Sequence, residues 1–152
     1  AFGMHGGPVG VTDGHHTYFR YPPDRDGPAP AEYTLMPTHL KSMFSVEELA
    51  DATLHPPLDF TKGAPVLRVP GLVPEKRGPG LYRDPFGRFG TSLYDLTNDP
   101  GQSTPVDDPA IVARLEDGLR GILRAHGATD DFYAWLGLTA PARSFANKTG
   151  GE

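Results

Sequence analysis

The sequence contains no cysteine. This absence excludes disulfides, thiolate metal sites and a cysteine nucleophile within the 152 residues. Long apolar runs are also lacking, because no stretch approaches the ~18 residues that a bilayer-spanning helix needs. No signal-peptide core is present either. The sequence therefore predicts a soluble chain with no membrane partner, and it assigns no compartment.

Positive charge is scarce. The chain has 14 Lys and Arg against 19 Asp and Glu, which gives a net charge of -5. Its longest basic run is Lys76-Arg77. Nucleic-acid binding by phosphate neutralisation needs a clustered basic surface. We therefore expect no nucleic-acid partner.

Glycine and proline are abundant, with 19 Gly and 17 Pro, while hydrophobic residues make up 38% of the chain. Such a composition supports a modest core with long irregular connections. We expect a single α+β domain over residues 1–138, with a small antiparallel sheet and a packed C-terminal helix, followed by a flexible tail over residues 139–152. Because Ala1 leads straight into strand-like sequence, we expect that the sequence begins inside a longer chain.

The stretch from Val9 to Tyr21 predicts a β-hairpin, because β-branched and aromatic residues flank Asp13-Gly14. A two-residue loop at Asp13-Gly14 would pair Val9 with Tyr18, Val11 with His16, and Thr12 with His15. One face would then carry Val9, Val11, His16, Tyr18 and Arg20, and the other would carry Thr12, His15, Thr17, Phe19 and Tyr21. A lone hairpin is marginal in water, so we expect later strands to pair with it and both faces to be at least partly covered.

Further strands are predicted at residues 32–36, 66–69, 81–83 and 89–96. The strand at 66–69 is bounded by Pro65 and Pro70, which favours an edge position.

Helices are predicted where capping residues precede apolar stripes. Ser45 and Glu48 form a capping-box pattern for a short helix over 46–52. Asp108 and Pro109 suit the start of a longer helix that stops at Gly127, with a Glu116–Arg120 pair on its outer face. A second short helix is expected with Thr129 as its cap, ending at Gly137.

The 6 histidines show no ligand spacing. His15 and His16 are adjacent in the predicted hairpin, so their side chains would point to opposite faces. No Ser-His-Asp pattern or nucleophile elbow is present. Residue chemistry alone therefore predicts no metal site and no catalytic residue in this chain.

Six segments carry a recognisable pattern, in order along the chain: Phe2–Pro23, Tyr33–His39, Phe44–Leu49, Phe60–Arg68, Leu93–Gln102 and Leu136–Leu138. Together they resemble one subgroup of bacterial sulfatases, arylsulfatase-like members of the alkaline-phosphatase superfamily, in the region after the catalytic core. The pattern Leu93-Tyr94-Asp95-Leu96, followed by Asp99-Pro100, is common in sulfatase C-terminal subdomains.

The resemblance implies that the chain is the C-terminal subdomain of a sulfuric ester hydrolase. A sulfatase uses a formylglycine, made within a Cys/Ser-x-Pro-x-Arg motif, and a divalent cation, usually calcium. Both would belong to a catalytic core outside this sequence, so we expect the chain alone to be inactive. In the family, this subdomain packs on the core and helps to wall the substrate cleft. We expect four side chains to reach the cleft rim and contact an anionic substrate, namely His5, His39, Lys41 and Lys62.

Two alternatives stay open. The chain would be a free-standing binding or interaction module derived from that subdomain, or a subunit that completes a separately encoded core.

Overall fold

The computed structural model describes residues 1–3, 7–24, 27, 29–36, 38–39, 42–71 and 90–140, without the side chain of Phe60. The predicted strand at 81–83 and most of the predicted tail lie outside the described residues. The described elements, in chain order, are β1 (Phe2–Gly3), β2 (Val9–Thr12), β3 (His16–Arg20), β4 (Glu32–Thr34), α1 (Val46–Leu49), β5 (Thr53–His55), the 3-10 helix η1 (Asp59–Thr61), β6 (Val66–Val69), β7 (Ser92–Asp95), α2 (Pro109–Ala125) and α3 (Asp130–Trp135).

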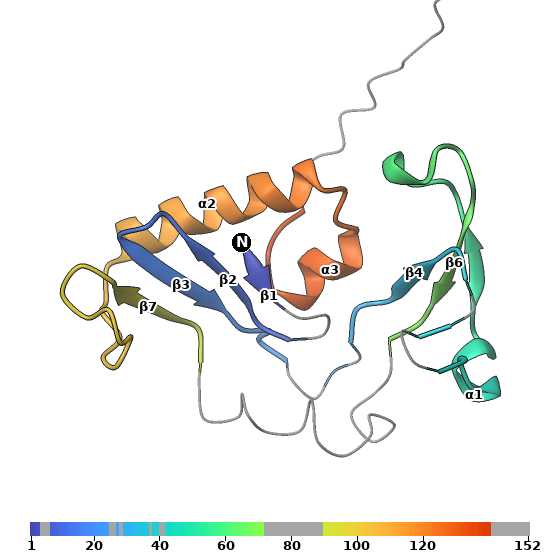
Figure 1. Ribbon diagram of the computed structural model, residues 1–152, viewed down its shortest axis with the longest axis horizontal. Helices are drawn as coiled ribbons and strands as arrows, with labels where there is room; N and C mark the ends of the chain where they lie inside the picture. The colour runs from blue at the N-terminus through green and yellow to red at the C-terminus, as the bar shows by residue number, and fades with distance from the viewer. Residues whose placement is uncertain are drawn as a thin grey trace, which may run out of the picture.

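The strands form two small antiparallel sheets (Figure 1), so the predicted α+β class is confirmed, with a second sheet that the sequence did not indicate. The first sheet has the order β1-β2-β3-β7 and the second has the order β4-β6-β5. We call residues 1–23 and 90–140 the large unit, which contains the first sheet with α2 and α3. We call residues 29–71 the small unit, which contains the second sheet with α1 and η1.

The hairpin forms, but the predicted pairing is wrong by two residues. Val9 faces Arg20 and Val11 faces Tyr18. The loop is Gly14-His15 rather than Asp13-Gly14, because Gly14 takes φ +91° at the first loop position, where a type II′ turn requires glycine. The Asp13 carboxylate accepts the amides of His15 and His16, which fixes this loop. A shift of two residues leaves every side chain on its predicted face.

The inner face of the first sheet carries the core. Tyr18 and Leu93 are buried there, and they pack against side chains of the C-terminal helices. The positions of the two C-terminal helices are confirmed: Asp108 caps α2 and Gly127 follows it, while Gly137 follows α3. Thr129 precedes α3, but its side chain makes no capping hydrogen bond, so its predicted capping role is wrong. The cluster consists of Val9, Val11, Tyr18, Leu93, Leu115, Leu119, Tyr133, Trp135, Leu136 and Leu138.

The predicted Glu116–Arg120 pair forms at 3.1 Å, but its position on an outer face is wrong. Glu116 lies on the sheet side of α2, where it accepts hydrogen bonds from Tyr18 at 2.7 Å and from Arg20 at 2.9 Å. The Arg20 guanidinium also donates to the Leu136 carbonyl, at 2.7 Å. The Arg20 guanidinium on β3 therefore holds the Glu116 carboxylate on the sheet side of α2, and it links both α2 and α3 to the sheet.

The small unit differs from its prediction in strand order. β6 is the central strand, so its predicted edge position is wrong. Pro65 and Pro70 lie just outside Val66–Val69, and all residues of β6 keep their amides for pairing. β5 was not predicted, and α1 and β4 are shorter than predicted. The capping box of Ser45 and Glu48 is confirmed.

Candidate functional site

The predicted rim residues are only partly described. His5 and Lys41 lie outside the described residues. His39 and Lys62 both belong to the small unit.

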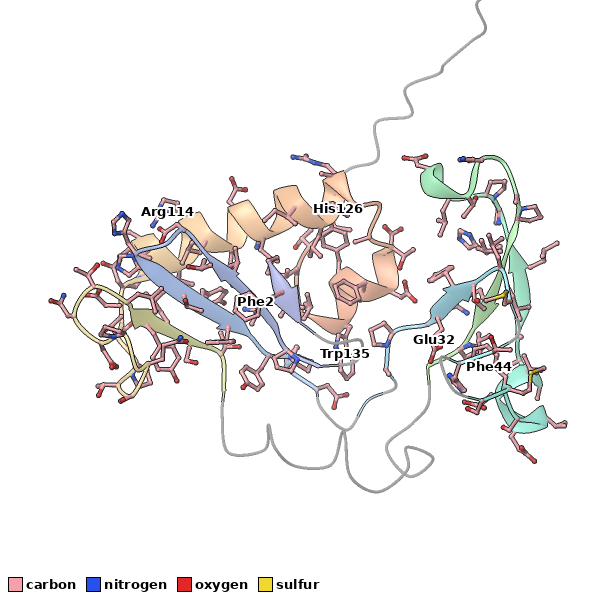
Figure 2. The ribbon with its side chains drawn as sticks, viewed as in Figure 1. Phe2, Glu32, Phe44, Arg114, His126 and Trp135 are labelled. Carbon is pink, nitrogen blue, oxygen red and sulfur yellow. The ribbon has the colours of Figure 1, made fainter. Side chains whose placement is uncertain are left out.

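His39 is enclosed by acidic and aromatic groups. Its Nε2 lies 2.7 Å from a carboxylate oxygen of Glu48 and its Nδ1 lies 3.6 Å from one of Glu32. The ring centre lies 4.2 Å from that of Phe44, and Figure 2 shows Glu32 and Phe44 together in the small unit. These contacts connect His39 with β4, with Phe44 and with α1. They also surround the ring with negative charge, which opposes an approaching anion.

The Glu48 carboxylate is held in its charged form. Burial alone would raise the pKa of Glu48, but the hydrogen bond from the Ser45 amide and the contact with His39 outweigh it and lower that pKa. The Ser45 amide donates to Glu48 at 2.7 Å, and the Glu48 amide donates to the Ser45 hydroxyl at 3.2 Å. The helix start and the position of His39 are therefore coupled through one carboxylate.

Lys62 is exposed and follows η1 in the left-handed region, with φ 53°. It precedes the Val66 end of β6, whereas Glu32, the partner of His39, pairs with Val69 at the other end. Figure 1 shows η1 and α1 at opposite ends of the second sheet. The structure therefore does not bring Lys62 and His39 into one site, and their contact with an anionic substrate stays a prediction.

The outer face of the first sheet carries three aromatic rings in contact. Phe19 contacts Phe2 at 5.8 Å and Tyr94 at 6.0 Å between ring centres, both edge to face. The ring of Phe2 lies directly over Gly10, where it would clash with a Cβ atom. Phe2 remains 50% exposed, whereas Phe19 and Tyr94 are half-buried. No helix of the described residues covers this face, since α2 and α3 pack against the inner one (Figure 1).

The described residues hold neither a metal-ligand cluster nor a membrane-crossing helix. No group of three or more His, Asp or Glu side chains there is placed to hold a metal ion. None of the helices found there is both long and apolar enough to cross a membrane.

In comparisons with known proteins, no family model, no curated protein and no solved structure matches the chain.

Proposed function

We propose that this chain is the C-terminal part of a sulfatase-type hydrolase, in which it forms a structural subdomain that packs on the catalytic core and helps to wall the substrate cleft. Sulfuric ester hydrolysis, with calcium and formylglycine, belongs to the whole enzyme. The alternatives are a free-standing module and a subunit of a separately encoded core.

The observation that supports this proposal best is the aromatic outer face of the first sheet. A sheet with one face on its own helices and aromatic rings on the other offers a surface for a larger body. Phe2, Phe19 and Tyr94 supply that surface. The order of the sulfatase-like segments, from Phe2 to Leu138, supports the same reading.

The isolated chain provides the first test. Incubated with an aryl sulfate and calcium, it should release no product above the uncatalysed rate, because the nucleophile and the calcium ligands lie elsewhere. Turnover that follows the purified chain would refute the proposal.

The outer face provides a second test, independent of activity. A Phe2→Lys/Phe19→Lys variant should bind less of an environment-sensitive apolar dye than the parent chain, because it places charge on the open face. The matched control is Ile122→Lys, at a position on α2 that is 36% exposed. Equal dye binding by both variants would remove the support that this face gives.

A further inference from the structure

A cavity of about 380 Å³ lies where the two units meet, lined by residues 23–24, 27 and 29–31, the end of β6 and α3. Its volume falls within the range of small-molecule sites, about 300–1,000 Å³. The walls are mainly apolar and include Pro23, Pro30, Pro70, Ala134 and Trp135. Figure 2 shows Trp135 on α3, the helix of the large unit nearest the small unit.

Arg68 brings positive charge to this cavity. Its nearest ionic contact is to Asp131, with 3.9 Å between Nη2 and Oδ2. That separation is too long for a hydrogen bond. Within the described part of the chain, the guanidinium makes no shorter polar contact. The side chain is 35% exposed, so its N–H groups are available to a ligand.

The carboxylates at the cavity already accept hydrogen bonds from the chain. Asp131 accepts from the Ala31 amide at 3.1 Å and from the Tyr33 hydroxyl at 3.4 Å. Asp24 accepts from the Gly27 amide at 2.9 Å. Asp24 and Asp131 thus bring negative charge to the same walls, but these hydrogen bonds hold both carboxylates against the chain and offset part of their charge. Arg68 keeps its donors for a ligand.

We propose that this cavity binds a small organic monocarboxylate whose compact apolar body lies against Trp135 and the prolines and whose carboxylate pairs with Arg68. The planar guanidinium matches a carboxylate through two parallel hydrogen bonds. The apolar walls favour a hydrocarbon ring over a second charged group. The proposal does not depend on the sulfatase assignment, because every residue that it uses lies in this chain.

The single tryptophan of the sequence makes the test direct, because Trp135 lines the cavity and no other tryptophan contributes to the emission. The full chain is titrated with cyclohexanecarboxylate and, separately, with its neutral analogue cyclohexanecarboxamide, while Trp135 emission is followed. The acid should shift the emission with a dissociation constant on the order of 1 mM, as expected for a fragment-sized ligand. The amide should bind at least tenfold more weakly.

Variants then identify the contact. Arg68→Met should weaken binding of the acid about tenfold or more and leave the amide within about twofold, since only the acid uses the guanidinium. Arg68→Lys keeps the charge without the planar fork and should weaken the acid less than Arg68→Met does. The control is Arg114→Met, at an arginine that pairs with Asp13 away from the cavity.

Each contrary outcome overturns the proposal. If neither compound changes Trp135 emission up to about 20 mM, a concentration far above the expected fragment affinity, the cavity is not a carboxylate site. If acid and amide bind equally, or lose affinity equally in Arg68→Met, Arg68 does not recognise the carboxylate. If Arg68→Met fails to give the cooperative melt of the parent chain, the Arg68→Lys titration decides.

Discussion

The large unit buries its apolar side chains between a sheet and two helices, whereas the small unit leaves many of its own in solvent. Leu119 and Leu136 are fully buried in the large unit. In the small unit, the exposed fraction ranges from 64% to 81% for a set of large apolar residues, namely Leu35, Met36, Met43, Val46 and Leu54.

This difference follows from what each sheet has available. The first sheet has α2, a 17-residue helix with an apolar stripe, to cover its inner face. Among the described residues, the second sheet has the 4-residue α1, which buries none of its residues, and the 3-residue η1. A small sheet without a covering layer gains little from apolar burial. The small unit therefore depends more on polar contacts with the large unit, such as the hydrogen bonds that Asp131 of α3 accepts from Ala31 and Tyr33.

The largest expected effect comes from opening the core of the large unit. Leu119→Ala should lower the free energy of unfolding by about 2–5 kcal/mol, because it removes fully buried methyl groups and leaves a cavity. Urea denaturation followed by circular dichroism measures it. Ile122→Ala, on the same helix but 36% exposed, is the control and should cost clearly less. If both variants lose the same free energy of unfolding, burial in the core of the large unit does not determine its stability.

The next largest effect comes from the hydrogen bonds that Glu116 of α2 accepts from Tyr18 and Arg20 of β3. Glu116→Ala should cost about 1–3 kcal/mol, since it leaves the Tyr18 hydroxyl and part of the Arg20 guanidinium without an acceptor. Arg120→Ala removes only the more exposed partner of Glu116 and should cost less than about 1 kcal/mol. The same denaturation experiment compares them. A larger loss in Arg120→Ala would contradict the inward position of Glu116.

Alkaline pH should act on the large unit through Tyr18. Burial raises the pKa of Tyr18 to about 12, and the contact with Glu116 adds to the rise while that with Arg20 opposes it. An unfolded tyrosine titrates near pH 10. Because the pKa of Tyr18 is higher in the folded chain, its protonated hydroxyl contributes to the free energy of unfolding. That contribution is complete below about pH 10 and is lost as the pH rises toward about 12.

The measurement is the melting temperature between pH 8 and pH 11, in steps small enough to resolve the onset. Tyr18→Phe should have a lower melting temperature than the parent chain at neutral pH. Between pH 8 and pH 11, its melting temperature should fall by less than that of the parent chain. A parallel decline of both proteins would show that Tyr18 does not carry the alkaline sensitivity.

The smallest effect is local to the small unit. Ser45→Ala should weaken the start of α1 by about 1 kcal/mol, because it removes a side-chain cap. Hydrogen exchange should speed up around residues 45–49 while the melting temperature of the large unit is unchanged. Thr129→Ala is the matched control, since Thr129 precedes α3 without a side-chain cap bond. A global loss of stability in Ser45→Ala would mean that the two units unfold together.

The features that sequence predicted best are those set by neighbouring residues. The capping box at Ser45, the cap at Asp108 and the stops at Gly127 and Gly137 depend only on the few residues beside them. The faces of the hairpin were also right, because the period of a strand is two and the shift of pairing was two.

The features that sequence missed depend on distant partners. The inward turn of Glu116 needs Arg20, which is 96 positions away. The central place of β6 depends on pairing with β4 and β5 on its two sides, whereas the neighbouring prolines had favoured an edge position. Of the predicted rim residues, His39 has Glu32 as a partner only because the chain folds back from β4. The cavity at Arg68 is lined by α3 and by residues about 100 positions earlier in the chain, so no local sequence motif predicts it.

The most direct test of the proposed function is to read the coding DNA immediately upstream of the codon for Ala1. The proposed sulfatase origin predicts an open reading frame that continues upstream and encodes a Cys/Ser-x-Pro-x-Arg motif. A start codon directly before Ala1, preceded by an in-frame stop codon, would contradict it.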